Sequence, residues 1–246
     1  MVGAEERPTG EPTPTCRAVL FDAGNTLIYM PQTAEDILMA LCHQLGAPID
    51  LEAARGAYHR SESYYARNYL GYSGEQGAFW HAYHGEALRY LGIDDPDGRK
   101  AAFLSHSFGR AGVWQAYPEA ERVCSTLRAM GVRLGVVSNG PVTVSDLLTQ
   151  AGLIPFFETV IASQAMGIQK PDPRIFREAL GRMGLRPNDA LFGGDLYDVD
   201  VVGARSAGLR AVLIDRDGHE GESDCPTIRT LDELIPLVTM FGARHV

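Results

Sequence analysis

An aspartate follows a short apolar run near the start of this sequence, at a point where a buried strand would end. Asp22 comes directly after Ala18-Val19-Leu20-Phe21 and precedes the turn-forming residues Gly24 and Asn25. A carboxylate held in such a place is rigid and partly shielded from water, so it can serve as a nucleophile or a metal ligand. A single strand-end aspartate can equally form a turn or cap a helix.

A second acidic group follows the apolar run Ala190-Leu191-Phe192. Asp195, Asp198 and Asp200 place three carboxylates within six residues. Like charges at this spacing repel one another in a poorly solvated site, and a divalent cation would relieve the repulsion. Hard oxygen ligands suit Mg²⁺. The alternative is a solvated acidic helix start, which the helix dipole would favour; of the two, the pattern favours the metal site.

Two further segments carry groups that can bind an anion. Ser138-Asn139-Gly140 follows an apolar run and offers a hydroxyl, an amide and accessible backbone N–H groups, although a plain turn would look similar. Lys170 precedes Pro171-Asp172-Pro173, and the prolines stiffen that loop. The lysine can point inward as a positive charge for a phosphate or carboxylate, or it can be an ordinary exposed loop lysine.

The elements that would position these groups alternate along the chain. Short apolar runs predict buried strands at 18–21, 134–137, 159–162, 190–192 and 211–214. Helical patterns lie between them at 119–130, 144–151 and 173–183. Alternating strands and helices predict a parallel sheet covered by helices on both faces, with the chemistry at the carboxyl ends of the strands. Asp22, Ser138 and Asp195 all lie at such ends.

Residues 31 to about 115 interrupt the alternation. They contain helical stretches at 34–45, 51–69 and 77–91 and little strand character. A helical insert at this place would sit above the carboxyl edge of the sheet as a lid. Arg60 and Arg67 are candidates to bind an anionic tail of a substrate. The insert is also rich in aromatic and histidine residues, many of which we expect to pack its own helices: Tyr58, His59, Tyr64, Tyr65, Tyr69, Tyr72, Trp80, His81, Tyr83 and His84.

Taken together, these segments resemble the haloacid dehalogenase-like (HAD) hydrolase superfamily. The resemblance is carried, in order, by Phe21-Asp22-Ala23-Gly24-Asn25-Thr26-Leu27, Val137-Ser138-Asn139-Gly140, Lys170-Pro171-Asp172, and Gly194-Asp195 with Asp200. It covers about residues 17 to 218. It implies an α/β fold with a Rossmann-like parallel sheet core and an inserted α-helical cap domain. The expected division is a flexible tail at 1–16, a core at 17–30 and 115–246, and a cap at 31–114.

The resemblance also implies a catalytic role for Asp22 and a Mg²⁺ cofactor. Asp22 would attack a small phosphorylated metabolite and form an aspartyl intermediate. By the same likeness, Mg²⁺ is held by Asp22, Asp195 and the backbone carbonyl of Gly24. Asp200 supports the metal or Lys170 from behind.

The anion-binding roles follow from the same likeness. Ser138 and Lys170 would steady the phosphoryl oxygens and the nucleophile, and Asn139 and Gly140 complete the phosphate-binding segment. A cation and a lysine would offset the repulsion between an anionic nucleophile and an anionic phosphate.

The sequence departs from the family's phosphatase pattern at Gly24. Phosphatases of the family usually carry a second aspartate there, which protonates the leaving group and then activates water. Dehalogenase members also lack that aspartate and need no Mg²⁺, but they usually carry a bulky aromatic residue instead. Because this chain keeps Asp195 and Asp200, the phosphatase interpretation ranks above the dehalogenase. A binding or regulatory protein that has lost activity is the third interpretation.

The bulk composition narrows the partners. The 246 residues contain 22 Lys and Arg against 31 Asp and Glu, a formal net charge of −9. This acidity disfavours nucleic acid as a partner. No apolar run reaches the roughly 18 residues of a membrane span, and the N-terminus lacks the apolar core of a signal peptide. We therefore expect a cytoplasmic protein that does not bind membranes, with unpaired thiols at Cys16, Cys42, Cys124 and Cys225. A monomer and a homodimer both remain open.

Overall fold

The computed structural model describes residues 16–68, 76–108, 114–140, 143–218 and 223–243. At its centre is a six-stranded parallel sheet with the order β5-β4-β1-β6-β7-β8. The strands are β1 (Ala18–Phe21), β4 (Arg133–Ser138), β5 (Thr159–Ala162), β6 (Ala190–Gly194), β7 (Arg210–Ile214) and β8 (Thr227–Ile228). The five strands predicted from the apolar runs are all confirmed, whereas the two-residue β8 was not predicted.

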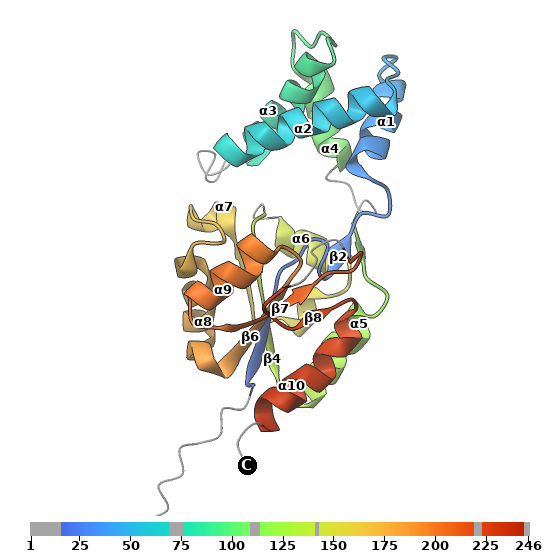
Figure 1. The fold of residues 1–246 in the computed structure, drawn as a ribbon. Coiled ribbons are helices and arrows are strands. Elements are labelled where there is room, and N and C mark those ends of the chain that lie inside the picture. Colours follow the sequence, from blue (N-terminus) through green and yellow to red (C-terminus); the bar gives the residue numbers. More distant parts are fainter. Residues whose placement is uncertain (1–15, 69–75, 109–113, 141–142, 219–222, 244–246) are drawn as a thin grey trace, which may run out of the picture.

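Helices cover both faces of this sheet, as Figure 1 shows. In β1 the side chains alternate: Val19 and Phe21 belong to one hydrophobic core, and Ala18 and Leu20 to the other. The first core is completed by α5 (Ala120–Ala129), α6 (Val144–Gln150) and α10 (Leu234–Ala243). The second is completed by α8 (Pro173–Met183) and α9 (Val202–Ser206). Burial on both faces explains why the strand sequences are continuously apolar.

The helix α8 shows how local sequence sets its ends. The Asp172 side chain accepts a hydrogen bond from the backbone N–H of Arg174, which caps the first turn. Pro173 occupies the first turn, where no backbone donor is needed. Gly184 ends the helix with φ of 61°, a conformation that glycine adopts readily. The predicted bounds 173–183 are confirmed.

The described residues between β2 and β3 form four helices, which lie beyond the carboxyl ends of the strands (Figure 1). They are α1 (Ala34–Gln44), α2 (Leu51–Asn68), α3 (Gln76–Tyr90) and α4 (Arg99–Phe108), and they share a hydrophobic core of their own. The first three match predicted helices. The sequence did not predict α4, in which Ala101 and Leu104 are the buried residues. The domain boundaries 17–30, 31–114 and 115–246 remain a prediction.

A short antiparallel ribbon carries the chain between the sheet and these helices. Its strands are β2 (Ile28–Tyr29) and β3 (Gln115–Ala116), which the sequence did not predict. Pairs only two residues long have no periodicity that could be recognised in the sequence.

The remaining elements are short. They are α7 (Ser163–Met166), the 3₁₀ turns η2 (Ile154–Phe156), η3 (Pro187–Asp189) and η5 (Leu231–Glu233), and the π-helix η4 (Tyr197–Val201). All four cysteines are free, as predicted. Within the part of the chain that the structure describes, no helix is both long and apolar enough to cross a bilayer.

Candidate active site

Three neighbouring strands place the predicted residues at one edge of the sheet. Asp22 follows β1, Ser138 ends β4, and Asp195 follows β6; β1 lies between the other two strands. The backbone N–H of Asp22 still donates to the carbonyl of Gly193 at 2.9 Å, so the nucleophile candidate is held by the sheet itself. The sequence-based expectation that these strand ends meet is therefore confirmed for the backbone.

Lys170 joins this edge from the loop before α8. Its side chain is only 2% exposed, and its Nζ donates to Asp22 Oδ1 at 2.5 Å and to Asp200 Oδ1 at 2.7 Å. The sequence left open whether this lysine points inward or is exposed on a loop. In the structure it points inward. Although burial opposes the charged form, Asp200 and Asp22 raise the pKa of Lys170 above its usual value. Lys170 is therefore a fixed cation at neutral pH.

Asn139 holds the backbone of that lysine. Its Nδ2 donates to the Lys170 carbonyl at 2.9 Å, and its Oδ1 accepts from the Lys170 N–H at 2.7 Å. The sequence suggested Asn139 as a phosphate-binding residue. In the structure its amide side chain binds the backbone of Lys170, and phosphate binding by the Ser138–Gly140 segment stays a prediction. Ser138 is buried, and a Cβ at Gly140 would come within 3.0 Å of the Ser138 hydroxyl.

Asp200 supports Lys170 from the π-helix η4. Its Oδ2 accepts from the backbone N–H of Leu196 at 3.0 Å, while its Oδ1 binds the lysine. Gly194 is required for this arrangement, because a Cβ at that position would overlap the Asp200 carboxyl group. Asp198, in contrast, is exposed and lies outside the carboxylate cluster. Of the three neighbouring acids in the sequence, two therefore face the site and one faces solvent.

The carboxylates outnumber the cation. Asp22, Asp195 and Asp200 each place one oxygen within 4.8 Å of the others. Burial is the main cause that raises the pKa of Asp22, with the Asp200 carboxylate adding to it and Lys170 opposing it. Burial likewise raises the pKa of Asp195, and the charges of Asp22 and Asp200 raise it further. In both residues burial is the largest cause of the raised pKa, and repulsion from the neighbouring carboxylates adds to it.

The donor set fits a magnesium ion. Ligand oxygens on opposite sides of Mg²⁺ lie about 4.2 Å apart, twice its usual bond length. Asp200 is already engaged by Lys170 and by the Leu196 N–H, so it is placed to support the site from behind. Asp22 and Asp195 would then supply carboxylate ligands, together with the Gly24 carbonyl that the family resemblance implies.

Gly24 faces an aromatic ring. A Cβ at this position would lie 3.6 Å from Cζ3 and 3.7 Å from Cη2 of Trp114, which is ordinary contact. Trp114 is half-buried and packs against the first core. The sequence gave no reason to select Trp114, because it comes from the other end of the helical segment. Asn25, next in the chain, has φ of 53°, which is uncommon for a residue other than glycine.

The aromatic residues of the helical segment mostly serve packing where the structure describes them. Phe79 and Tyr83 are buried together, with Tyr64 and Trp80 against them. His84 is buried, and burial lowers its pKa to about 4. The side chains of Tyr65, Arg67, Tyr69 and Tyr72 lie outside the described residues. Arg60 is an exposed partner of Glu86 at 3.8 Å.

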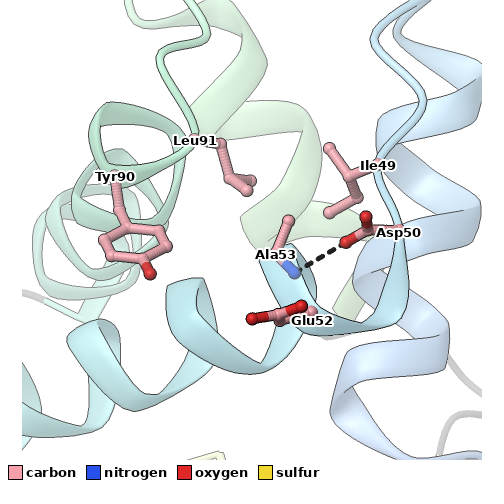
Figure 2. A pocket seen from close by; sticks show the side chains of 6 residues that line it. All are labelled: Ile49, Asp50, Glu52, Ala53, Tyr90 and Leu91. Carbon is pink, nitrogen blue, oxygen red and sulfur yellow. Dashed lines mark hydrogen bonds between the residues drawn. The ribbon is translucent and has the colours of Figure 1, made fainter.

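An open pocket of about 450 Å³ lies within this helical segment, between the start of α2 and the end of α3. Figure 2 shows its lining: Ile49, Asp50, Glu52, Ala53, Tyr90 and Leu91. The Asp50 carboxylate is used to cap α2, since it accepts from the Ala53 N–H at 2.8 Å. No member of the carboxylate cluster lines this pocket, so the two features are separate.

Arg216 is a partly buried charged residue near the site that the sequence pattern did not indicate. It follows β7, and its side chain is 15% exposed. Its partners come from segments about 100 and 190 residues away in the sequence, so no local pattern could reveal it.

Comparisons with known proteins agree with this geometry. A family model described as haloacid dehalogenase-like hydrolase matches residues 16–208. A glyceraldehyde 3-phosphate phosphatase from Methanopyrus kandleri is 30% identical over 207 residues, which cover 83% of this chain and 86% of that protein. Two crystal structures are also similar. The HAD phosphatase from Thermococcus onnurineus is 28% identical with a TM-score of 0.62, and the match covers 90% of this chain and 97% of that one. The 2-haloacid dehalogenase from Pseudomonas syringae pv. Tomato DC3000 is 26% identical with a TM-score of 0.67, covering 92% and 99%.

The family model spans most of the chain, and its match includes all three residues of the carboxylate cluster. The motifs that carried the resemblance meet at one edge of the sheet. The chain belongs to the haloacid dehalogenase-like hydrolases.

Proposed function

We propose that this enzyme is a magnesium-dependent phosphatase that hydrolyses a small phosphorylated metabolite through an aspartyl-phosphate on Asp22. The observation that carries the proposal is the cluster of three carboxylates, two of them buried and Asp195 partly buried, that Lys170 alone offsets among the described residues. A dehalogenase mechanism has no need for the excess negative charge. A phosphatase needs it to hold the cation that its substrate requires.

The chain's own residues account for the chemistry. Lys170 orients the Asp22 carboxylate and lowers its repulsion toward a phosphate. Asp22 attacks phosphorus, the P–O bond to the leaving group breaks, and an aspartyl-phosphate remains. A water then attacks this phosphorus, the bond to Asp22 breaks to restore its carboxylate, and inorganic phosphate leaves with the protons of that water. Mg²⁺, when bound, supplies positive charge that stabilises the charge developing on the phosphoryl oxygens.

No side chain at position 24 can donate a proton to the leaving group. Gly24 carries no acid, and the nearby Trp114 ring is not one either. The departing oxygen must therefore leave as a stable anion or take a proton from water or from another residue. This favours substrates whose leaving groups have low pKa values, such as acyl or aryl phosphates.

The relatives support the substrate class but not a particular substrate. The glyceraldehyde 3-phosphate phosphatase and the HAD phosphatase named above both act on phosphate esters by their names. We propose that residues 31–114 act as the cap that selects the substrate, because the helices α1–α4 stand beyond the strand ends that hold Asp22 and Asp195.

The dehalogenase and the inactive binding protein remain the competing functions. The likeness to the Pseudomonas syringae enzyme and the missing acid at Gly24 favour the former. The discriminating experiment offers the purified protein an aryl phosphate or 2-chloropropionate, each with Mg²⁺ and with EDTA. A phosphatase should release phosphate with Mg²⁺ and stop in EDTA. Chloride release that persists in EDTA would establish the dehalogenase, and no turnover of either compound would favour the binding protein.

A further inference from the structure

Arg216 makes four contacts from one guanidinium group. Nη2 donates to the Thr26 carbonyl at 2.8 Å, Nε donates to the Asn25 carbonyl at 3.2 Å, and Nη1 donates to Glu119 Oε1 at 2.8 Å. The guanidinium carbon also lies 3.3 Å from the centre of the Tyr117 ring, which is a close cation–π contact. A planar group with five donors can satisfy these directions together, whereas a lysine cannot.

The partners of Arg216 belong to the two passages of the chain between the sheet and the helices α1–α4. Asn25 and Thr26 lie on the outward passage just before β2, and Tyr117 and Glu119 lie on the return passage just after β3. The two passages are also joined directly, since the Tyr117 N–H donates to the Leu27 carbonyl at 3.0 Å. Arg216 therefore binds the residues that flank the β2–β3 ribbon at its base, the end nearest the six-stranded sheet.

The outward passage begins at the candidate nucleophile. Asn25 is the third residue after Asp22, and its left-handed backbone conformation needs support from its surroundings. The turn is closed at its near end, where the N–H groups of Leu27 and Ile28 both donate to the Ala23 carbonyl. Arg216 fixes the outer side of the same turn by holding the next two carbonyls after Gly24. The Gly24 carbonyl, a candidate metal ligand, thus lies between two anchored points.

We propose that Arg216 is a positioning residue, which holds the Gly24–Thr26 turn and the base of the β2–β3 ribbon in place so that the candidate metal site keeps its shape. It contacts Asn25, Thr26, Tyr117 and Glu119, none of which belongs to the carboxylate cluster. The proposal rests on the proposed function for its catalytic consequence, but the ordering of the turn can be measured without any activity.

The experiment compares Arg216→Gln with Arg133→Gln. Arg133 is a matched control because it also donates to a carboxylate and to a carbonyl, those of Glu158 and Met183, from the amino end of β4. Hydrogen exchange is measured over residues 22–30 and 114–119 by mass spectrometry. Magnesium affinity is measured by calorimetry, and kcat and KM with an aryl phosphate.

Arg216→Gln should speed exchange in both passages while the sheet strands stay protected. Its Mg²⁺ Kd should rise and its kcat fall, each by about 10-fold, as for other groups that orient metal ligands. KM should change less than kcat. Arg133→Gln should leave exchange in the two passages and Mg²⁺ affinity unchanged. Arg216→Lys should restore part of the loss, because it keeps the charge but not the fork of donors.

The proposal is overturned if Arg216→Gln folds and shows exchange in the two passages equal to that of the wild type. It is also overturned if exchange rises uniformly over the whole chain, since that would mark a merely structural role. Should Arg216→Gln not fold, Arg216→Lys and Glu119→Gln take its place with the same readouts. A wild type with no Mg²⁺-dependent turnover would refute the proposed function, and the exchange data would still decide the role of Arg216.

Discussion

Lys170 determines the charge balance of the candidate site by itself. Its ammonium lies among the carboxylates of Asp22, Asp195 and Asp200, and it binds the two that are buried, Asp22 and Asp200. Lys170 does not bind Asp195. The negative charge of Asp195 is therefore the one that a bound cation would stabilise most. The acidic pattern alone did not separate Asp198 from Asp200, which are two residues apart, and only the family resemblance selected Asp200. The π-helix η4 turns Asp200 inward and leaves Asp198 exposed.

Asp195→Asn should weaken Mg²⁺ binding by at least about 10-fold, because it removes a charged ligand from a site with few ligands. The matched control is Asp198→Asn, which removes the same charge three residues away on the exposed side of η4. It should change the Kd by less than about threefold, since an exposed charge is screened by water and salt. Titration calorimetry gives both constants. Equal binding by the wild type and Asp195→Asn would place the metal elsewhere.

Gly24 should make turnover depend steeply on the leaving group. A positioned acid contributes about 10²–10⁴-fold, and an alkyl phosphate lacking that help should react far more slowly than an aryl phosphate. Gly24→Asp should raise alkyl phosphate turnover, since its Cβ is accommodated beside Trp114. Gly24→Asn is the control of equal size that cannot transfer the proton. A flat dependence of log kcat on leaving-group pKa would mean that another residue supplies the proton.

Two glycines let neighbouring elements approach one another closely enough to form the site. The end of β6 must be Gly194 so that Asp200 can pack over it, and Gly203 in α9 lets that helix approach Pro171 beside the lysine. A glycine in a strand pattern signals close approach of another group, but not which group approaches. The helices α1–α4 are positioned instead by apolar packing, and α3 brings a histidine into that packing.

The stability of the helical segment should fall in acid because of His84 in α3. Its Nδ1 lies 2.9 Å from the Trp80 carbonyl and 3.0 Å from the Ser105 hydroxyl, and burial lowers its pKa from 6.5 to about 4. The unfolded chain therefore binds more protons than the folded one between these values, so stability is present above pH 6.5 and is lost as the pH falls toward 4. The loss between pH 7.5 and pH 5 should be about 2 kcal/mol.

Urea unfolding of His84→Asn at the two pH values measures this loss. The variant should be less stable than the wild type at pH 7.5, because packing is lost, but the difference should shrink by about 2 kcal/mol at pH 5. His43→Asn, which replaces an exposed histidine of α1, should keep the pH dependence of the wild type. A difference between His84→Asn and wild type that is independent of pH would show that His84 does not titrate below its usual value in the folded protein.

The order of strands in the sheet brings the residues of the site together. The chain fills the sheet from β1 toward β5 and then returns to the other side of β1 with β6. The reversal leaves Asp22 and Asp195 next to each other at the carboxyl edge, where parallel α/β sheets bind their ligands. A metal at this point would join two parts of the chain that are more than 170 residues apart.

Magnesium should therefore stabilise the entire fold. At a free concentration 100 times its Kd, an ion that binds only the folded state adds about 2.7 kcal/mol to the free energy of unfolding. Urea unfolding with MgCl₂ should show this increase relative to NaCl of equal ionic strength, and Asp195→Asn should not respond at the same MgCl₂ concentration. No stabilisation of the wild type would contradict both the metal site and the phosphatase proposal.

The sequence by itself determined the parallel α/β core, five of its six strands, and the inward-facing acids Asp22 and Asp195 at their ends. It could do so because buried strands are continuously apolar and because polar residues at their ends are few. The contacts of Lys170 with Asp22 and Asp200 were implied only by the family resemblance. The tertiary structure was needed to find that Asn139 binds the lysine backbone and that Trp114 and Arg216 flank the turn after Asp22. Those contacts join residues distant in the chain, and a local pattern carries no information about which distant side chains will meet.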